Sequence, residues 1–186
     1  MQEIENSLRI LKETLKAFKK SEENNLKSLS NQTIHTAATS QDFDNIILAV
    51  IVYALGKILE RDNYKQMDGW DLFFQTTIKN IDKAIASIKN KDFESFRLFL
   101  GKIREDVNKI DSNLSSYVKD VFYKAQINKA SKIYQHGVSA QKAAELLGVS
   151  LWDLASYIGQ GSVNEADIKD SLLFSERKKI MEEFLK

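Results

Sequence analysis

The stretch IILAVIVYALG, residues 46–56, decides the fold class of this chain. It is almost unbroken apolar sequence between Asp44 and Lys57, and as a helix it has apolar side chains on nearly every side. A membrane-spanning helix needs roughly 20 such residues, so this stretch is too short to cross a bilayer. We therefore expect a helix at the centre of a soluble core, covered on most sides by other helices.

Amphipathic helices are expected on either side of this central segment. Four stretches place apolar residues at steps of three and four, the spacing of one helix face: residues 4–18, 70–88, 93–110 and 114–134. Asp68 and Asp92 are placed to cap the second and third of these helices, and Gly137 to end the fourth. The polar stretch SNQTIHTAATSQ, residues 30–41, predicts a loop. The sequence thus predicts an all-α protein whose residues 1–128 form an antiparallel helical bundle.

The first of these helices carries a narrow apolar seam, made of Ile4, Leu8, Leu11, Leu15 and Phe18. A seam with this spacing needs an apolar partner. Two partners fit the pattern, namely the other helices of the same chain or the same helix of a second copy. The second alternative predicts a homodimer through the N-terminal helix.

Composition excludes several classes of function. The 186 residues include no cysteine and only two histidines, His35 and His136, so a thiolate site and a three-histidine zinc site are both ruled out. Glycine-rich phosphate-binding motifs are absent, and no carboxylates are paired in apolar sequence for acid–base catalysis. Arg97 is expected to pair with acidic residues of its own helix. The sequence therefore predicts no enzyme, no cofactor and no metal site.

A segment near the C-terminus, residues 129–160, carries the most specific local pattern. Ser139 is placed to cap a short helix that contains two adjacent alanines, which allow close packing. Gly148 permits the left-handed backbone that ends this helix, and Ser150 caps the next one. These features at these offsets predict a helix-turn-helix. It belongs to a second predicted unit, residues 129–186, which ends in a C-terminal helix.

The stretch SAQKAAELLGVSLW, residues 139–152, resembles the helix-turn-helix of small prokaryotic antitoxin-like DNA-binding proteins, which are commonly encoded beside nuclease toxins of the PIN class. The match consists of a KAAELLG helix, then Val149 and Ser150, then a helix containing Trp152. The whole chain also resembles uncharacterised archaeal helical proteins. The resemblance implies a transcription regulator of antitoxin type that binds double-stranded DNA in an archaeal cytoplasm. It also implies that residues 165–186 hold a protein partner such as a toxin.

The usual docking of a helix-turn-helix places the second helix in the major groove, with the preceding helix across the DNA backbone. This docking predicts the following DNA-binding residues: Gln141, Lys142, Ser150, Leu151, Trp152, Ser156, Tyr157 and Gln160. Further phosphate contacts are expected from Lys129, Lys132 and His136.

A second hypothesis follows from charge. The chain has 27 basic and 26 acidic residues, and the second helix of the motif contains no Arg or Lys, the residues that most often hold phosphate and read guanine. The alternative is a helical protein-interaction adaptor, in which the helix-turn-helix is a packing or docking module. A positive patch over residues 139–160 would favour DNA, and its absence would favour the adaptor.

The start of the sequence bears on location. The first 29 residues alternate charged and apolar side chains, without the continuous apolar segment of a signal peptide. We expect a cytoplasmic protein that makes no membrane contact.

Overall fold

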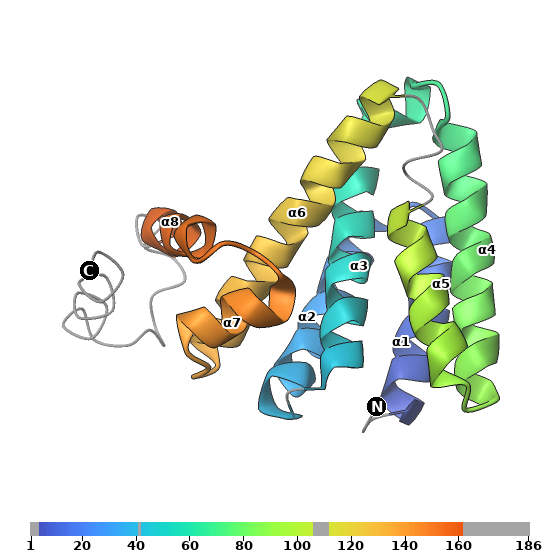
Figure 1. Ribbon diagram of the computed structural model, residues 1–186. Coiled ribbons are helices and arrows are strands. Elements are labelled where there is room, and N and C mark those ends of the chain that lie inside the picture. Colours follow the sequence, from blue (N-terminus) through green and yellow to red (C-terminus); the bar gives the residue numbers. More distant parts are fainter. Residues whose placement is uncertain (1–3, 41, 106–111, 162–186) are drawn as a thin grey trace.

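The computed structural model describes residues 4–40, 42–105 and 112–161 (Figure 1). Within these ranges it contains α-helices, one short 3-10 helix and no strand, which confirms the prediction of an all-α protein. The elements are α1 (Ile4–Lys19), α2 (Glu23–Ser40), α3 (Phe43–Leu59), η1 (Asp62–Gln66), α4 (Trp70–Lys89), α5 (Phe93–Glu105), α6 (Ser112–Gln135), α7 (Ala140–Leu147) and α8 (Leu151–Gly161). None of the described helices is long and apolar enough to cross a membrane.

Helix α3, which contains the apolar stretch quoted first, lies at the centre of the helices. Asp42 caps its start, because its carboxylate accepts a hydrogen bond of 3.0 Å from the backbone N–H of Asp44. The helix contacts α1, α2, α5, α6 and α7, and most of its side chains are buried. Burial on nearly all sides is what its lack of a polar face requires.

Helix α2 corrects the prediction of a loop over residues 30–41. The chain breaks earlier, at Ser21, whose φ of 54° turns the backbone between α1 and α2, and the helix then continues to Ser40. Two of its hydroxyl groups hydrogen-bond backbone carbonyls: Thr33 Oγ1 donates to Leu29 O at 2.9 Å, and Ser30 Oγ to Ala49 O on α3 at 2.6 Å. The polar composition therefore belongs to a helix in which Ser30 and Thr33 are bonded to the backbone.

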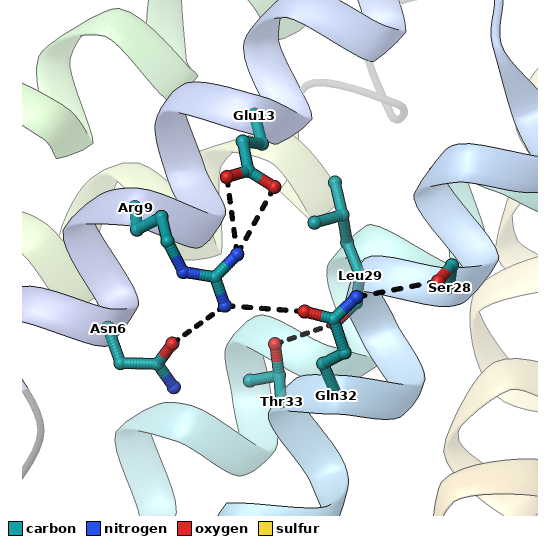
Figure 2. A network of polar contacts seen from close by, with 7 residues as sticks. All are labelled: Asn6, Arg9, Glu13, Ser28, Leu29, Gln32 and Thr33. Atoms are coloured by element: carbon teal, nitrogen blue, oxygen red, sulfur yellow. Dashed lines mark hydrogen bonds and ion pairs between the residues drawn. The ribbon is translucent and has the colours of Figure 1, made fainter.

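Figure 2 shows how the exposed sides of α1 and α2 are joined. Arg9 on α1 donates to Glu13 and to Asn6 of its own helix at 3.2 and 2.9 Å, and reaches across to Gln32 Oε1 on α2 at 3.3 Å. Gln32 in turn donates to Ser28 Oγ at 3.4 Å. This network lies at the surface, so we assign it a small share of the stability.

A glycine permits the close contact between α2 and α3. A Cβ atom added at Gly56 would lie 3.2 Å from the carbonyl oxygen of Glu23 and 3.2 Å from Cβ of Leu26. Any larger residue would push the start of α2 away from the central helix. Gly56 thus sets the distance at which these two helices pack.

The apolar seam of α1 packs against the same chain. Leu11 and Phe18 are buried, and the Phe18 ring stacks on Phe74 of α4 with ring centroids 4.9 Å apart. The other three seam residues are partly buried against the core. The first of the two predicted partners is therefore the observed one, and a homodimer through this helix would lack Leu11 and Phe18 as contacts.

The two predicted aspartate caps have different outcomes. Asp92 caps α5, since its carboxylate accepts from the backbone N–H of Ser95 at 3.0 Å, and this bond and the Ser95 side chain lower the pKa of Asp92. The prediction for Asp68 is wrong, because α4 begins after Gly69, whose φ is 88° and which provides no side-chain cap. The 3-10 helix η1 ends at Gln66, and α4 begins at Trp70, two residues after Asp68.

Arg97 also departs from its predicted pairing. Its guanidinium donates two hydrogen bonds, of 2.6 and 2.9 Å, to the carboxylate of Asp44 on α3, rather than to a neighbour on α5. The Asp44 side chain is 3% exposed and that of Arg97 is 53% exposed. A buried carboxylate is costly without a partner, so the pair fixes α5 against α3.

Helix α6 connects the two predicted units. It contacts α2 and α3 and also α7 and α8, which lie on the side of α6 away from α4 and α5 (Figure 1). The helix runs without a break through residues 128 and 129, the predicted boundary. Gly137, with a φ of 90°, follows its end as predicted.

Candidate protein or nucleic-acid interface

Helices α7 and α8, together with the residues that cap them, form the candidate site; we refer to residues 139–161 as the α7–α8 unit. Ser139 caps α7, because its hydroxyl accepts from the backbone N–H of Lys142 at 3.3 Å. The two alanines of α7, Ala143 and Ala144, are buried, and their small side chains allow α7 to lie close to its neighbours. Local sequence therefore explains where α7 starts and which face it buries.

The connection between α7 and α8 is three residues long. Gly148 adopts a φ of 62°, and its backbone N–H donates to Glu145 O at 3.2 Å. Val149 is buried in the corner. Ser150 caps α8, since its hydroxyl accepts from the backbone N–H of Asp153 at 3.0 Å and donates to the Asp153 carboxylate at 2.5 Å. The structure contains both serine caps and the left-handed glycine that the sequence predicts.

Helix α8 packs against α6 and is joined to it by two polar contacts. Leu154 is fully buried. Tyr123 on α6 donates its hydroxyl to the Asp153 carboxylate at 2.5 Å, and Asn128 on α6 donates to the hydroxyl oxygen of Tyr157 at 2.7 Å. These contacts fix which side of α8 faces α6 and which side faces outward.

On α7, the predicted DNA-binding residues are exposed and lie beside an acid. Gln141 donates to Glu145 at 3.4 Å, and the ammonium of Lys142 is 3.6 Å from the Glu145 carboxylate. A Lys–Glu pair on one exposed helix face is weak, but it places a negative charge next to the only lysine of the unit. The structure therefore brings Gln141 and Lys142 to the surface without forming a positive patch there.

On α8 and its cap, the predicted residues have different surroundings. The hydroxyl groups of Ser150 and Tyr157 already make the contacts described above. Leu151 and Ser156 are half-buried, whereas the indole of Trp152 is 71% exposed, the highest value among the exposed large apolar side chains of the described residues. Gln160 lies in the last turn of α8. Trp152 is therefore the predicted contact that projects most fully into solvent.

The charges of the α7–α8 unit are mostly negative. The unit contains one basic side chain, Lys142, and two acidic ones, Glu145 and Asp153. Hydrogen bonds from Ser150 and from Tyr123 lower the pKa of Asp153, so this carboxylate is ionised at neutral pH. The same Asp153 raises the pKa of Tyr123. Within these residues two acidic side chains accompany a single basic one.

Lys129 is not exposed for the phosphate contact that the sequence predicts. Instead of reaching phosphate at the surface, its side chain is fully buried on α6, donates to Asn31 Oδ1 on α2 at 3.0 Å, and lies 4.1 Å from the ring centroid of Tyr53 on α3. Burial, together with the charge of Lys132, lowers the pKa of Lys129 to about 7. No sequence pattern signals a buried lysine, because its partners belong to distant segments.

The two histidines meet, although the sequence offers no reason to expect it. The rings of His35, on α2, and His136, just after α6, are edge to face with centroids 4.8 Å apart. Both residues are exposed. Partial burial, His35 and Lys132 all lower the pKa of His136. A contact between helices so distant in the chain carries no local sequence signal.

Comparison with known proteins gave no matching family model, no similar curated protein and no similar solved structure. The resemblance to antitoxin-like proteins therefore rests on residues 139–152 alone. The predicted partner segment, residues 165–186, lies outside the described residues.

Proposed function

We propose that this chain is a helical protein-interaction module, and that Trp152 on α8 is the side chain that enters the partner. The observation that carries the proposal is the exposure of the indole, 71%, on a helix whose other face is fastened to α6. A single exposed aromatic residue is common on protein surfaces. Here, however, the exposed residue is the largest side chain of a unit whose remaining apolar residues are mostly covered.

The energetics of binding favour this residue. Tryptophan is enriched among the few interface residues that supply most of the binding free energy, because a large indole loses much water-exposed area when it enters a pocket. The contacts that Tyr123 and Asn128 make with α8 hold the helix before the partner arrives. Less conformational entropy is then lost on binding.

The charged side chains of the α7–α8 unit indicate which surface charge a partner should have. The α7–α8 unit, which contains Trp152, carries Glu145 and Asp153 against Lys142. A partner with an acidic surface would be repelled, and one with a basic rim would be attracted. We therefore propose a partner protein that has an apolar pocket for the indole of Trp152, bordered by Arg or Lys side chains.

The resemblance to antitoxin-like proteins suggests one class of partner. Nuclease toxins of the PIN class are commonly encoded beside proteins with this motif, and a nuclease that handles nucleic acid needs basic side chains near its substrate site. An α8 face with net negative charge is compatible with such a surface. This class is the first to examine, starting with the proteins encoded next to this chain.

A DNA-binding regulator is the second candidate function. It is supported by the tight connection between α7 and α8, with caps at Ser139 and Ser150 and left-handed backbone at Gly148. It is opposed by the lack of a free basic side chain in the unit, since phosphate contacts supply much of the affinity for DNA. The two candidates differ in whether α8 contacts a protein or a duplex.

The test is site-specific photo-crosslinking in cells. A photoreactive phenylalanine analogue replaces Trp152 in one variant and Leu98 on α5 in the matched control, because Leu98 is also well exposed, at 54%. We expect a discrete protein adduct from position 152 that resists nuclease and is absent from position 98. The captured protein, once purified, is expected to bind the unmodified chain at least about tenfold more tightly than Trp152→Ala.

Two results would overturn the proposal. One is an adduct at position 152 that nuclease removes, which would show that α8 contacts nucleic acid. The other is the same set of adducts from positions 152 and 98, which would show that exposure alone accounts for the crosslinks.

A further inference from the structure

A pair of histidines, His35 and His136, lies outside the surface that the proposed function uses. His35 lies on α2 and His136 follows the last residue of α6, so the pair bridges two helices that are distant in sequence. The ring centroids are 4.8 Å apart and both residues are exposed. They are the only histidines of the chain.

We propose that His35 and His136 form a two-histidine binding site for a divalent transition-metal ion, such as Zn²⁺, Ni²⁺ or Cu²⁺. Two imidazoles that bind one tetrahedral zinc ion at Zn–N distances of about 2.0 Å place their ring centroids roughly 5 Å apart. The observed separation of 4.8 Å matches this spacing. Exposed side chains can make the small ring rotations that direct one nitrogen of each ring at the ion.

The surroundings of His136 favour the neutral form of its ring. A histidine binds a metal ion as neutral imidazole. Partial burial and the neighbouring His35 and Lys132 lower the pKa of His136, so its ring is neutral at pH 7.

The surroundings select the kind of metal. Among the described residues no group of three or more His, Cys, Asp or Glu side chains is placed to hold an ion, so the site offers two nitrogen ligands and water completes the coordination. Mg²⁺ and Ca²⁺ prefer oxygen ligands and would not be held. The positive charge of Lys132 weakens binding of any cation, which leaves the ions that bind imidazole most strongly, Cu²⁺ above all.

A bound ion would join α2 to α6. Asn31 lies one helical turn before His35, and it already accepts a hydrogen bond from Lys129 of α6 at 3.0 Å. The metal would add a second connection between the same two helices. Because the unfolded chain does not hold the two histidines together, binding would raise the stability of the folded protein.

The experiment uses the full chain without a histidine tag, titrated with NiCl₂, ZnCl₂ or CuCl₂ at pH 7.5 and followed by thermal unfolding and calorimetry. We expect one ion per chain, a rise in Tm that EDTA reverses, and affinity at least about tenfold lower in His35→Gln and in His136→Gln. Lys132→Gln is the matched control, since it keeps both histidines and removes the opposing charge. It is expected to bind at least as tightly as the unmodified chain.

A second measurement keeps the result independent of folding defects in the variants. The unmodified chain has two histidines, whose ring signals can be followed by NMR, and a small amount of Cu²⁺ is expected to broaden both signals together. Broadening of one signal alone, equal affinity in both single-histidine variants and the unmodified chain, or no metal-dependent change in Tm would each overturn the proposal.

Discussion

Helices α3 and α8 use apolar residues in opposite ways. In α3, 13 of 17 residues are buried, including the apolar side chains on nearly every face. In α8, only Leu154 is buried among the side chains that the structure describes, and the largest one, Trp152, is mostly in water. The apolar side chains of α3 are covered by other helices, whereas Trp152 on α8 stays exposed among the residues that the structure describes.

The buried side chains of α3 and the exposed Trp152 of α8 therefore have different roles, folding stability for α3 and the proposed partner binding for Trp152. Side chains of α3 contribute to the free energy of folding, because folding removes them from water. Trp152 remains in water after folding, so it contributes little to that free energy and is available to a partner. Substitutions that act on one helix should therefore leave the property of the other largely unchanged.

The largest effect is expected at the centre of α3. Leu55 is fully buried, so Leu55→Ala removes apolar contacts and leaves a cavity, which should lower the free energy of unfolding by about 2–5 kcal/mol. The matched control is Leu98→Ala, at an exposed position, with an expected change within about 0.5 kcal/mol. Urea unfolding followed by circular dichroism measures both. Equal losses in the two variants would contradict the central position of α3.

The next effect concerns Lys129, at the junction between the bundle and the α7–α8 unit. Its pKa of about 7 in the folded chain lies below the value of about 10.4 in an unfolded chain. Between these values the unfolded state binds the extra proton, so stability rises with pH, by up to about 1.4 kcal/mol per pH unit. Below pH 7 both states are protonated and this contribution to the slope vanishes.

Lys129→Met removes the titrating group and serves as the reference. Urea unfolding of both proteins at pH 7, 8 and 9 should show the unmodified chain gaining stability relative to the variant as pH rises. A difference that stays constant over this range would mean that Lys129 keeps an ordinary pKa, and hence that water reaches its ammonium group.

A smaller effect is expected at the turn before α8. Gly148 has a φ of 62°, and a Cβ atom there would meet nothing within 4 Å, so Gly148→Ala should cost only the backbone strain of about 1–2 kcal/mol. Gly159→Ala is the control, because it is helical and equally open and should stabilise the chain by about 0.5–1 kcal/mol. Thermal unfolding distinguishes the two signs; destabilisation in both variants would disprove the backbone explanation.

The smallest effect on stability is expected at the residue that matters most for the proposed function. Trp152→Ala removes a side chain that is 71% exposed, so the free energy of unfolding should change by less than about 0.5 kcal/mol. Urea unfolding beside Leu55→Ala makes the comparison direct. A loss of 2 kcal/mol or more, measured against the scale of core truncations, would show that Trp152 is a packing residue.

The sequence predicts the helices well where the signal is local. Apolar spacing located α1, α3, α4, α5 and α6, and the caps Ser139 and Ser150 set the starts of α7 and α8 within a residue. The exception is α2, where residues 30–41 have the composition of a loop. Its side chains Leu26, Leu29 and Ile34 have helical spacing and are buried, so tertiary contacts with α3 outweigh weak helix propensity.

The candidate sites are less predictable, because they depend on contacts between distant segments. The exposure of Trp152 follows from its position on α8, and the sequence predicts it as a contact residue. By contrast, the pairing of Asp44 with Arg97, the burial of Lys129 and the meeting of His35 with His136 each require knowledge of which helices are neighbours. Helical periodicity gives the face of a residue and not the helix opposite it.

The most direct test of the account follows the fluorescence of Trp152 itself. The chain has two tryptophans, and Trp70→Phe, at a buried position, leaves Trp152 as the only reporter. This variant is titrated with the protein captured from position 152 and, separately, with the duplex upstream of its own gene and a scrambled duplex, at low and at physiological salt. We predict a blue shift and loss of acrylamide quenching with the protein, and no preference between the duplexes. Selective, salt-sensitive protection of Trp152 by the upstream duplex, with no change on adding the protein, would contradict the account.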